Sequence, residues 1–170
     1  MANQDELYAD AVAAYGAALE RLARAYATDP DRARDLLQDI HVALWQSLSR
    51  FEGRCSLRTW TYRVAHNVAT SQVVRRRVSA PTLVGLDELE ETPAAIDADE
   101  ALDAHRALER LQALVRCLKP LDRQLMLLYL EGVDAASIGE VTGLSAGNVA
   151  TKIHRIKAVL ARRFHDTEAR

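Results

Sequence analysis

The sequence has few of the residues that build disulfide frameworks, metal sites or membrane spans. Among its 170 residues there are two cysteines, four prolines and seven glycines, and aromatic residues make up 5%. Cys55 and Cys117 form no CxxC pair, so neither a disulfide framework nor a structural zinc site is expected. No apolar run approaches the ~18 residues of a membrane helix, and the N-terminus lacks a leader pattern. We expect no cofactor, no metal, no membrane insertion and a cytoplasmic location.

The residues that are abundant favour helices. Apolar residues make up 49% of the chain, and with so few aromatics and glycines this composition suits Ala- and Leu-rich helices better than strands. Apolar side chains recur at steps of three and four, the period of an amphipathic helix. We predict an all-α protein with helices at about 7–26, 30–48, 57–77, 100–118, 120–131, 134–142 and 145–164.

Residues that commonly cap or end helices lie at these predicted helix ends. Thr28 or Asp29 is suited to cap the second helix, whose first turn tolerates Pro30. Ser56 and Ser145 are suited to cap the third and last helices. Glycines follow two other helices, at 132 and 143, where a left-handed residue commonly ends a helix.

Charge is distributed unevenly, although the formal net charge is only −2. Residues 50–78 hold seven arginines and one glutamate, so their local charge is +6, whereas residues 79–105 hold eight acids and no Lys or Arg. Such blocks predict separate surfaces with separate partners. We expect two small helical domains, 1–78 and 100–170, joined by an acidic flexible linker at 79–99. One hypothesis is that this linker folds back over a DNA-binding surface.

The two short C-terminal segments are typical of a helix-turn-helix. The last helix has a polar face opposite its apolar stripe, and its side chains can donate to phosphates and base edges in the major groove: Asn148, Thr151, Lys152 and Arg155. A lone basic face is usually only solvated. The preceding helix and turn favour DNA, because the motif places the start of its second helix in the groove.

The third helix and the loop before it combine cations with aromatic and amide side chains: Arg50, Phe51, Arg54, Arg58, Trp60, Tyr62, Arg63, His66, Asn67 and 75–77. Cations follow phosphates, and rings or amides can stack on or bond unpaired bases. Trp60 lies on the apolar stripe, so we expect it in the core. A neighbouring polar face repeats every fourth residue, at Arg58, Tyr62, His66 and Thr70.

These stretches resemble the extracytoplasmic-function group of bacterial sigma factors. DLLQD at 35–39, Trp45, FEG at 51–53 and LRTWTYRVAHN at 57–67 are similar to that family's region two. LKPLDR at 118–123, YLEG at 129–132, IGEVTGLS at 138–145 and GNVATKIHR at 147–155 are similar to its region four. The resemblance covers nearly the whole chain in the right order.

The resemblance implies a specificity subunit that is not an enzyme, with core RNA polymerase, promoter DNA and an anti-sigma factor as partners. It implies contacts to the clamp coiled coil of polymerase by Asp35, Gln38, Asp39 and Trp45. It implies contacts to the melted minus-ten element by Phe51, Gly53, Arg54, Ser56, Arg58, Tyr62, Arg63 and Asn67. Asn148, Thr151, Lys152 and Arg155 would then contact the duplex minus-thirty-five element.

Three positions depart from the family pattern. His41 stands where an aromatic residue is usual, and Ala150 stands where many relatives carry a basic residue. Gly139 replaces a common alanine, and glycine inside a helix costs about 1 kcal/mol relative to alanine. These departures bear on promoter sequence more than on function.

Other functions remain open from the residues alone. A helix-turn-helix regulator with a ligand- or protein-binding N-terminal half would fit 134–164, but it would not need the basic, aromatic segment 50–77. An enzyme could use Asp35 and Asp39 with His41 or His66 as ligands or acid and base, yet no complete set accompanies them. A redox switch through the two cysteines has little support.

Overall fold

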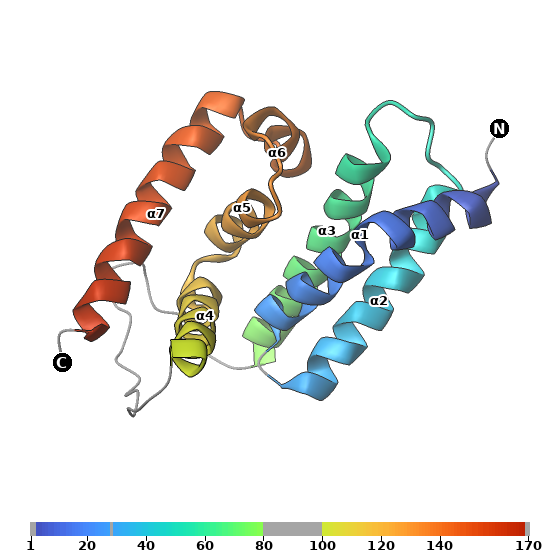
Figure 1. The fold of residues 1–170 in the computed structure, drawn as a ribbon. Coiled ribbons are helices and arrows are strands. Elements are labelled where there is room, and N and C mark those ends of the chain that lie inside the picture. The colour runs from blue at the N-terminus through green and yellow to red at the C-terminus, as the bar shows by residue number, and fades with distance from the viewer. Residues whose placement is uncertain (1–2, 28, 80–99, 169–170) are drawn as a thin grey trace.

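The computed structural model describes residues 3–27, 29–79 and 100–168, and in these residues the only regular elements are helices. Figure 1 shows two groups of helices lying side by side. The N-terminal module consists of α1 (Gln4–Tyr26), α2 (Pro30–Leu48) and α3 (Leu57–Ser79). The C-terminal module consists of α4 (Glu100–Cys117), α5 (Pro120–Leu130), α6 (Ala135–Thr142) and α7 (Ala146–Glu168). The prediction of an all-α fold is confirmed.

The predicted linker falls mostly outside the described residues, which omit 80–99. Ser79, expected at its start, is instead the last residue of α3. The hypothesis that the acidic segment covers a DNA-binding surface therefore stays a hypothesis, as do the predicted domain boundaries.

Helix ends follow the local chemistry of the sequence. The Asp29 carboxylate caps α2 by accepting from the Asp31 N–H at 2.9 Å, with proline in the first turn. Ser56 Oγ accepts from the Thr59 N–H at 3.0 Å at the start of α3. Gly132 and Gly143 have φ angles of 68° and 79°, a left-handed conformation in which a Cβ is strained. These predicted helix boundaries are confirmed.

Each module has an apolar core built from the periodic stripes of its helices. In the N-terminal module, the buried residues include Leu19, Leu22, Leu36, Ile40, Leu44 and Leu48. In the C-terminal module, they include Leu125, Leu128, Ile138, Val149, Ile153 and Ile156. Burying one such side chain contributes roughly 1.5–3 kcal/mol, so these stripes provide the main stabilisation of both helical packings.

The two cores meet along α3, which packs against α1 and α2 on one side and α5 and α6 on the other. Tyr62 of α3 and Ala18 of α1 belong to the buried cluster of the C-terminal module, and Leu127 of α5 packs against the other cluster. A helix with neighbours on two sides has little polar surface left. The polar face that repeats at Arg58, Tyr62, His66 and Thr70 is therefore not an open surface, because the side chains of Tyr62 and His66 are 3% and 1% exposed.

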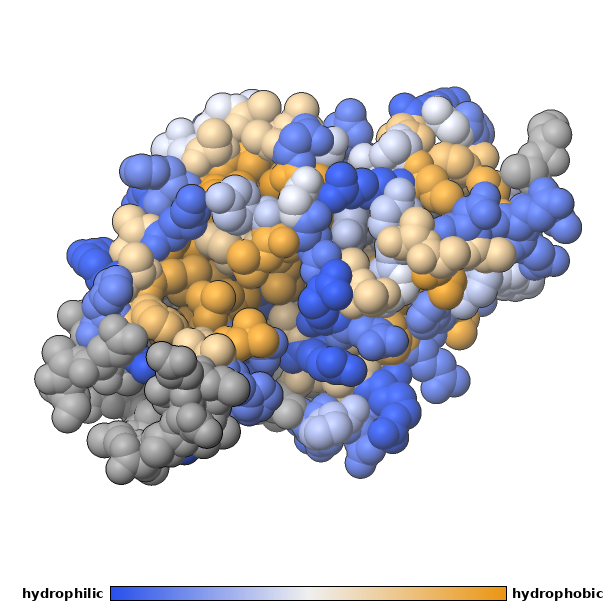
Figure 2. All heavy atoms as spheres, in the orientation of Figure 1, coloured by the Kyte–Doolittle hydropathy of each residue, from blue (hydrophilic) through white to orange (hydrophobic). Residues whose placement is uncertain are grey.

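The C-terminal module is closed by contacts between its first and last helices. Arg110 of α4 donates to the carbonyl of Phe164 in α7 at 2.9 Å, and its guanidinium carbon lies 4.7 Å from the centre of the Phe164 ring. Figure 2 shows apolar surface on the face between α7 and the neighbouring helices α4 and α5. Several large apolar side chains of this module keep exposed area: Leu108, Leu121, Tyr129 and Leu130.

Candidate nucleic-acid interface

One face of α2 presents acids together with apolar groups. Asp35, Gln38 and Asp39 are exposed, and the Asp39 carboxylate accepts a 2.6 Å hydrogen bond from the amide of Gln72 on α3. Trp45 lies two turns further along α2 and is 44% exposed. An exposed tryptophan on the same helix as exposed carboxylates is typical of a protein-binding surface, because it combines a large apolar area with charge.

Contacts to the start of α1 fix the orientation of Trp45. Its indole N–H donates to the Asp5 carboxylate at 2.9 Å, and its backbone carbonyl accepts from the Gln4 amide at 2.7 Å. One turn earlier, the Tyr8 hydroxyl lies 2.9 Å from Nδ1 of His41. The imidazole that replaces the family's usual aromatic residue thus bonds within the N-terminal module.

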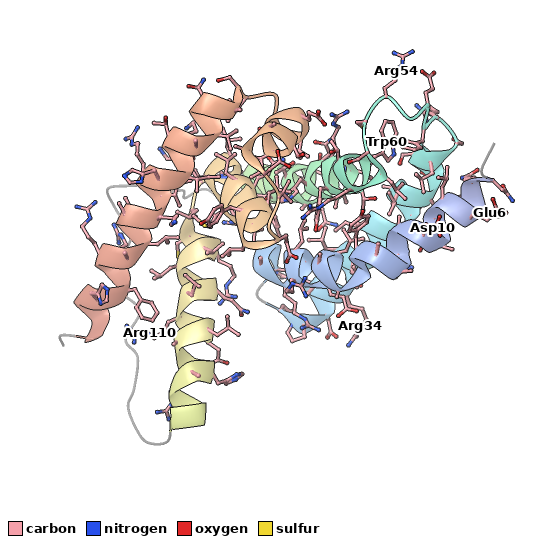
Figure 3. All side chains as sticks on the ribbon, turned by 45° about the horizontal axis from the view of Figure 1, so that its top comes forward. Glu6, Asp10, Arg34, Arg54, Trp60 and Arg110 are labelled. Atoms are coloured by element: carbon pink, nitrogen blue, oxygen red, sulfur yellow. The ribbon has the colours of Figure 1, made fainter. Side chains whose placement is uncertain are left out.

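The loop between α2 and α3 places polar groups above an aromatic floor. Gly53 has φ 71°, and Arg54 pairs with Glu52 at 2.6 Å. Phe51 packs edge-on against Trp60 with ring centres 5.4 Å apart, and Figure 3 shows Arg54 pointing away from the body of the protein above Trp60. The Trp60 indole donates to Ser47 Oγ at 3.0 Å, so this ring is a fixed, partly buried support, as expected.

A groove of about 420 Å³ runs between α2 and α3. Most of its lining can donate or accept hydrogen bonds, and Asn67 at its wall is exposed. The lining residues are Asp39, Val42, Ala43, Gln46, Asn67, Val68, Ser71, Gln72 and Arg75. Among the predicted minus-ten residues of α3, Asn67 therefore faces away from the side that meets the C-terminal module.

The predicted residues Arg58, Tyr62 and Arg63 lie against the C-terminal module. Arg58 donates to the backbone carbonyl of Glu131 at 2.8 Å, and Arg63 donates to that of Glu140 at 2.7 Å. The Tyr62 ring is buried next to Tyr15, with ring centres 5.9 Å apart, and burial raises the pKa of its hydroxyl. These three side chains are brought together, but each is occupied by protein contacts.

His66 sits one turn beyond Tyr62 and is buried in the N-terminal module. The Tyr26 hydroxyl lies 3.3 Å from its Nδ1. Burial disfavours the charged imidazolium, and it lowers the pKa of His66 to about 3. This histidine is therefore a neutral core residue, and neither a base-contacting nor a metal-binding role suits its position.

Helices α6 and α7 form the predicted helix-turn-helix. Asp134 caps α6 by accepting from the Ser137 N–H at 2.9 Å and the Ser137 hydroxyl at 2.7 Å, which holds the pKa of Asp134 below its usual value. A Cβ on Gly139 would lie 2.6 Å from the Leu144 carbonyl oxygen. Glycine at 139 therefore permits the close approach of the turn, which explains this departure from the family's alanine.

The outer face of α7 is open. Asn148, Thr151 and Arg155 are exposed at the start of the helix. Lys152 is partly exposed and its amine lies 3.7 Å from the carboxylate of Asp122 on α5, a contact that fixes the lysine beside the other three. The four predicted residues therefore lie together, as a surface that can enter a major groove requires.

Sequence reasoning missed the residues that join the modules. Arg21 and Glu131 are separated by 110 residues and form a two-point ion pair, with both N···O distances 2.7 Å. The Glu131 hydrogen bond raises the pKa of Arg21. Arg123 places its guanidinium 5.1 Å from the Tyr26 ring centre. No local periodicity marks such pairs, and only the YLEG stretch drew attention to Glu131.

The described residues contain neither a cluster of metal-binding side chains nor a helix that could span a membrane. Within 3–27, 29–79 and 100–168, no three His, Cys, Asp or Glu side chains gather in a way that would hold a metal ion. No helix in this part of the chain is both long and apolar enough to cross a membrane.

Known families match both modules. The Sigma-70 region 2 family model matches residues 11–78, and the Sigma-70, region 4 family model matches residues 108–160. The chain is 24% identical over 173 residues to the ECF RNA polymerase sigma factor SigW of Bacillus subtilis, covering 96% of this chain and 92% of the relative. It is 28% identical over 159 residues to the RNA polymerase sigma factor CnrH of Cupriavidus metallidurans, covering 88% and 82%.

Solved structures share the fold. CnrH in complex with the cytosolic domain of CnrY gives a TM-score of 0.69 at 23% identity, covering 96% of this chain and 90% of that one. The sigma factor RpoE in complex with the anti-sigma factor NepR from Bartonella quintana gives 0.66 at 20% identity, covering 89% and 92%.

Fold and site define an all-helical protein of two modules whose C-terminal module ends in a helix-turn-helix. The matches to two successive regions of one family, in the expected order, then identify it further. The chain belongs to the sigma-70 family of RNA polymerase sigma factors, in its extracytoplasmic-function group. Members of this family are in general non-catalytic subunits of RNA polymerase.

Proposed function

We propose that this chain binds core RNA polymerase in the cytoplasm, directs it to promoters and helps to open the minus-ten element, without catalysing a reaction itself. The observation that carries the proposal is the pair of consecutive family matches, because each match falls on a module with an exposed polar helix face. A duplex-only regulator would not need a region-2 module.

The acidic face of α2 is proposed to grip the clamp coiled coil of polymerase. Asp35, Gln38 and Asp39 offer exposed acceptors, and Trp45 offers apolar area held in one orientation by Asp5. A preoriented ring loses less conformational freedom on binding than a mobile one, which favours affinity.

The minus-ten element is proposed to open onto the loop 51–56 and α3. Phe51, Gly53, Arg54 and Ser56 would receive an extruded base above the Trp60 ring. Arg58, Tyr62, Arg63 and Asn67 would support the separated strand. Extruding a base costs a few kcal/mol and least at weakly paired sequence, so a pocket that accepts the base can offset that cost.

The minus-thirty-five element is proposed to lie on α7. Asn148, Thr151, Lys152 and Arg155 are grouped at its start, where a recognition helix enters the major groove. Amide and guanidinium groups can read base edges there, and lysine contributes mainly through phosphate contacts.

An anti-sigma factor is proposed to regulate the protein. Two solved structures that share its fold are complexes, one with the cytosolic domain of CnrY and one with the anti-sigma factor NepR. The fold likeness supports a partner of the same class for this chain.

The test combines sigma-free core polymerase, the purified protein and genomic promoter fragments. We expect run-off transcripts and permanganate-reactive thymines that depend on this protein. The double variant Asp35→Lys/Asp39→Lys should abolish both signals, whereas Asp10→Lys, an exposed acid on α1 (Figure 3), should leave them unchanged. Duplex binding without polymerase association or strand opening would contradict the proposal and favour an ordinary regulator.

A further inference from the structure

Both lysines of the last helix, α7, are held by side chains of α5. The Lys152 amine lies 3.7 Å from the Asp122 carboxylate. The Lys157 amine donates to the Tyr129 hydroxyl at 3.1 Å and lies 5.0 Å from the centre of that ring. A lysine is a point charge on a flexible four-carbon stem, so its amine is usually mobile at a surface. Here α5 restricts the position of each amine.

The two contacts serve different faces of α7. Lys152 lies with Arg155 on the face proposed to enter the major groove. Lys157 follows Arg155 by two residues, which places it about 160° away around the helix. The contact of Lys152 with α5 therefore bears on the DNA-facing surface, whereas that of Lys157 supports helix packing on the other side.

The Asp122 carboxylate is mostly buried. Its side chain is 12% exposed, against 41% for that of Lys152. A carboxylate that is taken out of water is costly to leave without a partner. Asp122 is also the third residue of α5, which begins at Pro120. An acid in the first turn of a helix interacts favourably with the helix dipole, so a purely structural role for Asp122 is the alternative to be tested.

Holding the amine changes what Lys152 can contact. Nonspecific DNA binding comes from cations that follow phosphates, whereas sequence is read by groups that meet base edges at defined positions. To follow a phosphate, the Lys152 amine must leave Asp122 and strand a mostly buried carboxylate. An ammonium has three donors, so it can keep one on Asp122 and present the others to base edges. The contact thus penalises phosphate binding and permits base reading.

We propose that Asp122 is a positioning residue for promoter recognition. Without touching DNA, it holds Lys152 for the reading of base edges in the minus-thirty-five duplex and suppresses contacts of that lysine with phosphates. Part of the sequence selectivity is thereby assigned to α5, which lies outside the helix-turn-helix. The inference rests on the proposed minus-thirty-five role of α7.

The test compares the affinities of the full chain for two duplexes. The parent protein first selects duplexes from a pool with a randomised centre. The most enriched duplex and an unenriched one of the same length are then the two probes, and fluorescence anisotropy gives both affinities. Selectivity is the ratio of these affinities, and the salt dependence of binding to the unenriched duplex reports the number of phosphate contacts.

Asp122→Asn should lower the selectivity about two- to fivefold, the range that a partly exposed ion pair supports. The loss should come from tighter binding of the unenriched duplex, because Lys152 is then able to reach a phosphate. The salt slope for that duplex should become steeper by about one. In a Lys152→Gln background, Asp122→Asn should leave the selectivity unchanged.

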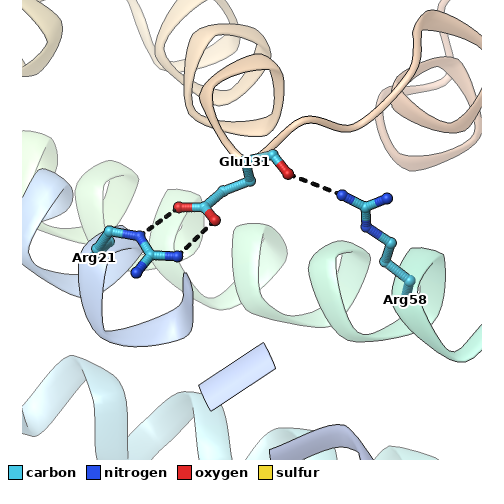
Figure 4. Close-up of polar contacts among 3 residues, drawn as sticks. All are labelled: Arg21, Arg58 and Glu131. Atoms are coloured by element: carbon cyan, nitrogen blue, oxygen red, sulfur yellow. Dashed lines mark hydrogen bonds and ion pairs between the residues drawn. The ribbon is translucent and has the colours of Figure 1, made fainter. Parts of the chain in front are cut away.

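Two matched variants separate positioning from charge and from packing. Glu140→Gln makes the same charge change at an exposed position on α6, so it should tighten binding of both duplexes equally. Glu131 does not suit this purpose, because Arg21 binds its carboxylate (Figure 4). Tyr129→Phe removes the acceptor of Lys157, and it should lower stability in urea while leaving the selectivity unchanged.

The outcomes distinguish the positioning role from the function on which it rests. Equal selectivity changes in Asp122→Asn and Glu140→Gln, or an effect of Asp122→Asn that persists without Lys152, overturn the positioning role. A loss of stability in Asp122→Asn with unchanged selectivity, as expected for Tyr129→Phe, also overturns it. If the parent enriches no duplex, or if Lys152→Gln binds both duplexes as the parent does, the proposed minus-thirty-five role of α7 fails and the positioning role fails with it.

Discussion

The two surfaces proposed to meet DNA differ in accessibility. On α7, Asn148, Thr151 and Arg155 are exposed. On α3, Tyr62 is 3% exposed and Arg63 is bonded to the C-terminal module. A surface for intact duplex can remain open in the free protein, whereas one for separated strands is needed only after polymerase has bound. The difference teaches that the two modules need not become competent at the same time.

The first expected effect tests this difference by measuring how tightly variants of the free chain bind DNA. Arg155→Ala should weaken binding to a minus-thirty-five duplex by about 1–3 kcal/mol, the range for a base-contacting arginine. Arg63→Ala should leave duplex binding unchanged, because this residue faces α6 instead. Fluorescence anisotropy with a short promoter duplex measures both.

Arg162→Ala is the matched control, because it removes the same charge from an exposed position further along α7. Its loss should be smaller and the same for all sequences. An equal loss of duplex affinity in Arg63→Ala and Arg155→Ala would remove the distinction between the two surfaces.

The next effect concerns the turn of the C-terminal module. Gly139→Ala puts a Cβ 2.6 Å from the Leu144 carbonyl oxygen, and backbone atoms cannot move aside easily. Overpacking of this kind typically costs about 1–3 kcal/mol, which exceeds the helix-propensity gain of alanine. Urea unfolding followed by circular dichroism gives the change in stability.

Gly147→Ala is the comparison for that turn, since nothing lies within 4 Å of its added Cβ. It should be neutral or slightly stabilising. A stabilising Gly139→Ala would show that the α6–α7 turn relaxes freely.

A third effect distinguishes the modules by pH. The pKa of His66 falls from its model-peptide value near 6.5 to about 3 on burial. The unfolded chain binds a proton at His66 more readily than the folded chain does. The stability that the folded protein gains from neutral His66 is therefore complete above pH 6.5, and it is lost as the pH falls from 6.5 towards 3. The N-terminal module should lose up to ~1.4 kcal/mol per pH unit in that window.

Tryptophan fluorescence reports this unfolding selectively, because both tryptophans, Trp45 and Trp60, lie in the N-terminal module. His154→Gln, an exposed change on α7, should keep the slope. His66→Gln should flatten it, and a slope that persists there would assign the pH dependence to another group.

The smallest effect concerns the helix cap of α2. Asp29→Ala removes the acceptor for the Asp31 N–H and should lower stability by about 1 kcal/mol. Asp29→Ser keeps an acceptor and should recover most of that loss. Denaturant midpoints of the three proteins measure it, and identical midpoints would mean that the cap contributes nothing to the N-terminal module.

Local chemistry made most of the fold predictable. Asp29, Ser56 and Gly143 mark helix ends through short-range hydrogen bonds and backbone conformation, and apolar periodicity gives the buried stripes. The burial of Tyr62 and His66 was not predictable in this way, because α3 has neighbours on two sides and periodicity describes one. The Arg21–Glu131 pair spans 110 residues, and no pattern within a helix indicates it.

The candidate site was likewise predictable from local sequence in one part and not in the other. The residues of α7 were found because the helix-turn-helix is a local motif, and they lie together as expected. The assignment of roles along α2, the loop and α3 came from family resemblance and stays a prediction. From the sequence, Gly139 was interpreted as a cost to the stability of its helix. The contact that requires glycine is with the following turn, and helix propensity does not describe contacts of that kind.

Because Arg58 and Arg63 bond to backbone carbonyls, these contacts do not depend on which amino acids occupy positions 131 and 140. Every residue type supplies a carbonyl there as long as α5 and α6 end where they do. The arginines can thus keep their acceptors while these side chains drift in evolution. Of the three acceptors, only the carboxylate bound by Arg21 depends on the identity of a side chain, that of Glu131. A single substitution there can therefore tune the strength of contact between the two modules without redesigning either one.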